Sequence, residues 1–121
     1  MKSVPSETRP HGAADPDNFT LPALMQRLLG RDDDLAVRLY RVSFGIDGAT
    51  NWHSHDDAQL LYGLSGTCIV GNRAGIETLL GPGDLVIVEP GEEHWHGAAP
   101  GRKGEHLAIN LGKETTWLEP S

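Results

Sequence analysis

Residues 52–59 read Trp-His-Ser-His-Asp-Asp-Ala-Gln, and residues 90–96 read Pro-Gly-Glu-Glu-His-Trp-His. Side chains alternate between the two faces of a β-strand, so His53 and His55 are expected to project to the same side. Gln59 has the same parity if the chain stays extended, and a third histidine must arrive from another strand. Three imidazoles and one carboxamide oxygen are neutral lone-pair donors, which are typical of a divalent transition-metal site. The predicted metal ligands are His53, His55, Gln59 and His94.

Length and composition restrict the class of protein. The chain has 121 residues and a net charge of −7, which fits one domain with its own core and argues against nucleic acid as a partner. No run approaches the roughly 18 apolar residues that a membrane-spanning helix needs. Cys68 is the single cysteine and is expected to be a small buried hydrophobe. We therefore expect a soluble, cytoplasmic protein that acts on a small molecule.

The first 29 residues differ from the rest. Residues 1–18 are polar and contain three prolines, and we expect them to form a flexible arm ahead of a domain over residues 19–121. Within residues 21–29, apolar side chains recur at helical spacing, which favours a short amphipathic helix. An irregular strand is the alternative. The apolar face of this segment and an open strand edge together predict a homodimer or homotetramer.

From Leu35 onward the pattern is that of short strands separated by glycine-bearing turns, which predicts an all-β sandwich or barrel. The expected strands lie within residues 35–44, 58–64, 67–70, 76–80, 85–88 and 106–111.

The arrangement of these motifs resembles that of the cupins. Gly48, His53, His55, Gln59 and Gly66 match the first cupin motif, with the glutamine in place of the usual acidic residue. Gly83, Asp84, Pro90 and His94 match the second motif. The resemblance covers about residues 35–111 and implies a single cupin β-barrel, with two antiparallel sheets closed in a jelly-roll-like manner and the metal inside near one mouth.

Within the cupins, the chain is similar to a subgroup of small proteins that includes carboxymuconolactone-decarboxylase-associated cupins and cupin-type hydroxynitrile lyases. That resemblance implies manganese or iron in a site of three histidines and one glutamine, with nickel, cobalt or zinc as further possibilities. It also implies His106 as the acid/base residue, and a substrate pocket lined by Tyr40, Val42 and Asn110. A carboxamide cancels no metal charge, so such a site should polarise a bound oxygen strongly.

The residues alone do not fix the orientation of His106 or the role of His96, the two histidines near the predicted ligands. His106, Ala108 and Asn110 share one face of the last strand, and Leu107, Ile109 and Leu111 share the other. Alternation does not decide which face points inward, so His106 faces either a cavity or solvent. His96 has the parity of His94 and is interpreted as a supporting residue rather than a further ligand.

The function expected from these observations is that of a divalent-metal-dependent enzyme acting on a small polar molecule, most concretely a hydroxynitrile-lyase-like carbon–carbon lyase. A metal-dependent dioxygenase, a sugar-acid isomerase and a non-catalytic small-ligand-binding cupin are the alternatives, because one scaffold hosts many chemistries.

Overall fold

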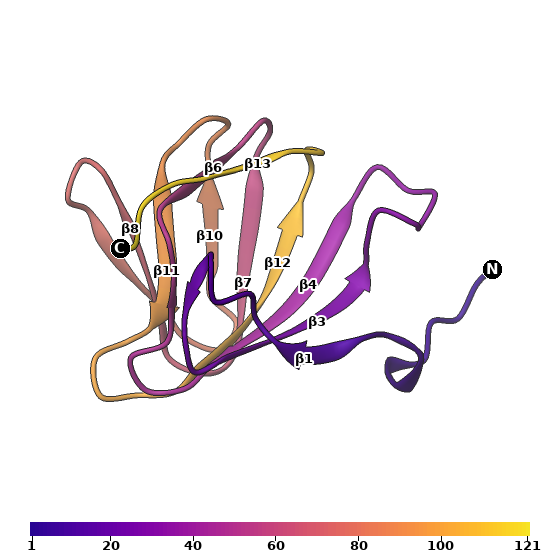
Figure 1. The fold of residues 1–121 in the computed structure, drawn as a ribbon, viewed down its shortest axis with the longest axis horizontal. Coiled ribbons are helices and arrows are strands. Elements are labelled where there is room, and N and C mark those ends of the chain that lie inside the picture. Colours follow the sequence, from indigo (N-terminus) through magenta and orange to yellow (C-terminus); the bar gives the residue numbers. More distant parts are fainter.

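Backbone pairing in the computed structural model, which describes residues 1–121, divides the strands between two antiparallel sheets that face each other (Figure 1). The first sheet has the order β1-β3-β4-β12-β7-β10. Its strands are β1 (His11–Ala13), β3 (Ala23–Leu29), β4 (Arg38–Phe44), β12 (Gly104–Asn110), β7 (Gln59–Gly66) and β10 (Leu85–Val88).

The second sheet has the order β13-β6-β11-β5-β2, and β8 pairs with both β11 and β9. Its strands are β13 (Thr115–Trp117), β6 (His53–His55), β11 (His94–Ala98), β5 (Ala49–Thr50), β2 (Phe19–Thr20), β8 (Cys68–Asn72) and β9 (Glu77–Leu80). The expected all-β cupin-type architecture is confirmed.

Alternation along β4 and β12 separates an interior face from an exterior face. On β12 the residues of one parity, from Gly104 to Asn110, are buried, and those of the other parity are only partly buried. On β4, Val42 and Phe44 are buried, and Val42 is paired with His106. Of the two orientations that the sequence left open for His106, the structure has the interior one.

The apolar core fills the space between the sheets on one side of the histidines. It includes Phe44, Leu61, Val70 and Leu80, which are almost fully inaccessible to solvent. Gly66 lets β7 pass almost directly into β8, since it adopts φ 59° and a side chain there would collide with the backbone of Lys103. The glycine that matches the end of the first cupin motif is therefore required both by its backbone conformation and by the close approach of Lys103.

Residues 23–29 of this segment form the strand β3, so the expected helix is wrong and the alternative of a strand is right for these residues. β3 pairs with β1 on one side and with β4 on the other. The backbone hydrogen bonds of two neighbouring strands outweigh the helical spacing of its leucines. The only helical element is the 3-10 turn η1 (Ser6–Thr8), and no helix in the chain is long and apolar enough to cross a bilayer.

Candidate metal centre and cavity

Strand register brings the histidines of the two sequence motifs together. β6 and β11 are neighbours in the second sheet, and His53 is paired with His94. The ring centroids of these two residues are 4.2 Å apart, and the ring of His55 lies 5.1 Å from His53 and 5.4 Å from His94. The three predicted histidine ligands therefore form one buried group.

A backbone or hydroxyl oxygen contacts the Nδ1 atom of each of these rings. His53 Nδ1 donates to the carbonyl of Asn51 at 2.8 Å, and His94 Nδ1 donates to the carbonyl of Glu92 at 2.9 Å. His55 Nδ1 lies 3.0 Å from Thr115 Oγ1. Because a carbonyl only accepts, His53 and His94 carry their proton on Nδ1 when neutral, which leaves Nε2 with a free lone pair.

Gln59 completes the group and is held in one orientation. Its Nε2 donates to Asn110 Oδ1 at 2.8 Å, which directs its Oε1 toward His94 Nε2 at 2.9 Å. With the His94 proton on Nδ1, two acceptor atoms face each other without a proton between them. Two lone pairs at this separation repel unless a cation lies beside both. The donor set therefore fits a metal ion, and the buried His55 Nε2, which has no protein partner, fits it too.

Burial keeps these imidazoles in the form that binds metal. Desolvation lowers the pKa of His53 well below its usual value and lowers the pKa of His55 to about 4. The pKa of His94 is also lowered, again mainly by burial. Neutral imidazole is the ligand form, so no proton competes with a metal here near neutral pH.

His96, which the sequence assigned a supporting role, belongs to the same cluster. His53, His94 and His96 each offer a ring nitrogen, and these atoms lie within 4.8 Å of one another. His96 Nδ1 is 2.9 Å from His106 Nε2, so His106 joins the cluster through His96. The shared parity of His96 and His94 was the available signal in the sequence, but the distance of His96 from His53 depends on how β11 lies against β6 in the folded protein.

His106 is fully buried and lies beside Phe44, with ring centroids 5.6 Å apart. Burial lowers its pKa to about 4. It does not line the cavity described next, whereas His96 does. A molecule in the cavity would therefore meet His96 first, with His106 one hydrogen bond behind it.

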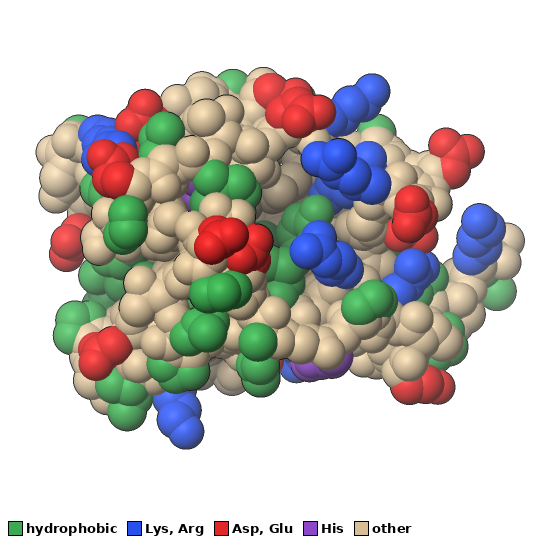
Figure 2. All heavy atoms as spheres, in the orientation of Figure 1, with side chains coloured by type: hydrophobic (Ala, Val, Ile, Leu, Met, Phe, Trp, Pro, Cys, Tyr) green, Lys and Arg blue, Asp and Glu red, His purple; other side chains and the backbone are tan.

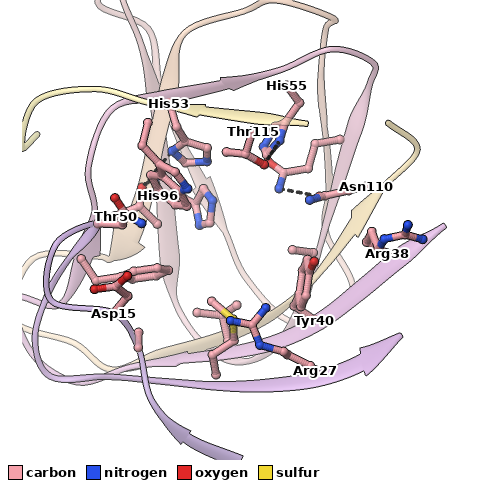
Figure 3. A pocket seen from close by; sticks show the side chains of 18 of the residues that line it. Asp15, Arg27, Arg38, Tyr40, Thr50, His53, His55, His96, Asn110 and Thr115 are labelled. Carbon is pink, nitrogen blue, oxygen red and sulfur yellow. Dashed lines mark hydrogen bonds between the residues drawn. The ribbon is translucent and has the colours of Figure 1, made fainter. Parts of the chain in front are cut away.

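A cavity of about 520 Å³ opens beside the histidines and is shown in Figure 3. Its wall includes the predicted pocket residues Tyr40, Val42 and Asn110. His53, His55, Gln59 and His96 also line it. The structure thus brings the expected pocket residues and most of the expected metal ligands to one space, although His94 lies behind its surface.

Cys68 and Trp117 lie at different distances from the histidines and have different roles. Cys68 is fully buried, and desolvation raises the pKa of its thiol to about 12, which agrees with the expected hydrophobic role. The ring of Trp117 lies 4.6 Å from that of His53 and forms part of the cavity wall. Trp117 therefore contributes to the site, which its position near the end of the chain did not indicate.

Comparisons with known proteins identify the family and agree with the fold. A family model described as "Cupin domain" matches residues 40–110. An (R)-mandelonitrile lyase of Granulicella tundricola is 35% identical over 122 residues, covering 98% of this chain and 92% of that protein. A cupin-like protein of Thermotoga maritima has a TM-score of 0.84 at 30% identity, covering 92% of this chain and 87% of its own. The polyketide cyclase RemF of Streptomyces resistomycificus, at 19% identity, shares the fold with a TM-score of 0.80 over 100% of this chain and 87% of that one. With a histidine cluster of metal-binding character enclosed between its two sheets, the chain belongs to the cupin family.

Proposed function

We propose that this protein is a divalent-metal-dependent lyase that cleaves a cyanohydrin into a carbonyl compound and hydrogen cyanide. The observation that carries the proposal is the pair of facing acceptors, His94 Nε2 and Gln59 Oε1, beside a partly enclosed cavity that Gln59 lines. The relative that is a mandelonitrile lyase, matched over almost the whole chain, supports the reaction class.

His53, His55, Gln59 and His94 would hold the metal, with manganese or iron as the proposed ion. When bound, such a cation would supply Lewis-acid stabilisation of negative charge on a substrate oxygen. The chain's own part is to fix these donors. Asn110 orients the Gln59 amide, and the carbonyls of Asn51 and Glu92 fix the tautomers of His53 and His94.

The remaining histidines would handle the proton. His96 lines the cavity and would accept the hydroxyl proton of the cyanohydrin, while its Nδ1 contact with His106 shares the charge with a second imidazole. As that proton leaves, the carbon–oxygen double bond forms and the bond to the nitrile carbon breaks. Its electron pair departs with cyanide, which takes the proton back to leave as hydrogen cyanide.

The test is cleavage of mandelonitrile by protein loaded with manganese or iron(II), followed through benzaldehyde formation. We expect turnover in the wild type and a loss of about 100-fold or more in kcat for His106→Ala, within the range of general acid–base catalysis. The two proteins must contain equal amounts of metal, so that a lower kcat cannot result from lower metal content.

Fully metallated wild-type protein without activity on mandelonitrile or an aliphatic cyanohydrin would contradict the proposal. Oxygen uptake by the iron(II)-loaded protein with a diol, in the absence of cyanide release, would instead favour a dioxygenase.

A further inference from the structure

The interior faces of β3 and β4 change from apolar to cationic along their length. Met25 is paired with Val42, and Arg27 is paired with Tyr40. By alternation, Arg27 continues the face that carries Met25, and Arg38 continues the face that carries Tyr40 and Val42. Both arginines therefore emerge from the interior surface that lines the cavity, at the end of the strands away from Phe44.

Four basic side chains, those of Arg27, Arg31, Arg38 and Lys113, line this cavity. Basic side chains also group on one side of the molecule in Figure 2. None of the four forms an ion pair, although four ion pairs tie other arginines of the chain to carboxylates. Four unpaired basic side chains in one cavity are unexpected in a protein with a net charge of −7, because its acidic residues outnumber its lysines and arginines. Uncompensated positive charge in a partly enclosed space favours an anion there.

The two arginines nearest Tyr40 are partly fixed in place. The guanidinium carbon of Arg27 lies 5.9 Å from the centre of the Tyr40 ring. Arg38 Nη1 donates to the carbonyl of Leu35 at 2.8 Å, and Arg38 Nε is buried without a hydrogen-bond partner. A buried, unpartnered guanidinium nitrogen indicates a missing acceptor.

The acidic residues of the wall do not neutralise this group. The cavity contains two carboxylates, Asp15 and Glu114, and neither forms an ion pair with a basic side chain. Asp15 lies on the opposite side of the cavity from Arg38 (Figure 3), and it accepts the backbone N–H of Asp17. The cavity therefore has a cationic end and an end of neutral imidazoles.

We propose that the cavity binds substrates carrying a carboxylate remote from the reacting carbon, with the carboxylate held by Arg27 and Arg38 beside Tyr40. Guanidinium groups match a carboxylate with paired, charge-assisted hydrogen bonds. The proposal rests on the proposed function only for the reacting end, which lies against the histidines. A neutral cyanohydrin such as mandelonitrile would still reach the histidines but would leave the arginines without a partner, so it would bind more weakly than a substrate with a carboxylate.

The test compares two unreactive ligands of equal shape, 4-(hydroxymethyl)benzoate and 4-(hydroxymethyl)benzamide, by isothermal titration calorimetry with the metal-loaded protein. We expect the benzoate to bind about tenfold more tightly at low ionic strength, and this preference to weaken with added salt. Arg27→Gln and Arg38→Gln should each reduce the preference, because each removes a positive charge that attracts the benzoate more strongly than the neutral benzamide. Neither readout requires turnover, so a failed lyase assay leaves this test intact.

The matched control is Arg41→Gln, since Arg41 lies on the same strand as Arg38 but on its opposite face, where it pairs with Glu105. This variant should prefer the benzoate over the benzamide as strongly as the wild type does. Equal affinities of the wild type for the two ligands would overturn the proposal without any variant. A preference that survives both substitutions would also overturn it, because the carboxylate would then bind elsewhere, as at the metal. Phenyl phosphate binding much more tightly than the benzoate would reject a carboxylate in favour of a phosphate.

Discussion

At the scale of single residues, the site depends on which atoms carry protons. The carbonyls beside His53 and His94 place both protons on Nδ1, and Asn110 turns the Gln59 carboxamide so that its oxygen faces His94. These three contacts leave lone pairs of His94 and Gln59 directed at one another in a buried space. The chain thus stores unfavourable electrostatics that a bound cation relieves, which couples metal binding to stability.

Two histidine substitutions separate the metal ligands from the residue that handles the proton. We expect His94→Ala to lose most of its metal during purification, because it removes a donor that no other side chain replaces. His96→Ala should keep metal close to the wild-type level and lose activity. Elemental analysis of both proteins, purified without added metal, provides the measurement. A His96→Ala protein as metal-depleted as His94→Ala would show that the compact triad of His53, His94 and His96 holds the ion instead.

At the scale of elements, β4 and β12 are tied on their outer face by one carboxylate. Glu105 accepts hydrogen bonds from Arg41 Nη2 at 2.9 Å and from Ser43 Oγ at 2.6 Å. The hydrogen bond from Arg41 is the main reason that the pKa of Glu105 lies below its usual value. A lowered pKa in the folded state means that ionised Glu105 stabilises the fold above its unfolded pKa. That contribution is lost as the pH falls through the folded pKa.

Glu105→Gln should therefore lower the free energy of unfolding by about 1 kcal/mol at neutral pH, the scale of a partly exposed ion pair with one added hydrogen bond. The difference from the wild type should shrink at a pH below the unfolded glutamate pKa of about 4.3, since the stabilisation by ionised Glu105 is lost as the pH falls below that value. Urea unfolding at the two pH values measures it. Glu77→Gln, on exposed β9, is the control and should unfold like the wild type at both. A difference that grows on acidification would contradict the assignment.

Sequence patterns predicted the features that depend on neighbouring residues better than the features that depend on pairing between distant strands. The shared face of His53 and His55 was predictable because period-two alternation is local to β6. The apolar spacing within residues 21–29 is also a local pattern, but the helix predicted from it is wrong. Pairing with β1 and β4 decides the conformation of β3 instead. Arg27 and Arg38 come together only through the register of β3 with β4, so no motif indicated the cationic end of the cavity.

The position of His106 shows a limit of the same kind. Alternation along β12 showed which residues share a face with His106 but not whether that face points inward. In the structure it points inward. The exposure of His106 depends on residues from other strands: the rings of His96 and Phe44 pack against it, and His96 rather than His106 lines the cavity. Parity predicts direction along a strand, whereas exposure to a cavity depends on tertiary packing.

At the scale of the whole molecule, part of the outer surface of the first sheet, over β10, β7 and the end of β12, is apolar. Leu85 and Ile87, on the edge strand β10, are 53% and 58% exposed. They are paired with Tyr62 and Leu60 of β7, and these in turn with Leu107 and Ile109 of β12. A contiguous apolar surface beside an unpaired strand edge is a feature that isolated soluble domains avoid.

We expect a second copy of the chain to cover this surface in a homodimer, because a two-fold arrangement buries the same patch of both copies at once. Ile87→Lys should then shift the protein from dimer to monomer in size-exclusion chromatography with light scattering, since it places a charge in the buried interface. Leu79→Lys is the matched control: Leu79 is 60% exposed on β9 of the other sheet, and its substitution should leave the dimer intact. A wild-type protein that is monomeric at high micromolar concentration would contradict the expectation. Dissociation caused by Leu79→Lys rather than by Ile87→Lys would move the interface to the second sheet.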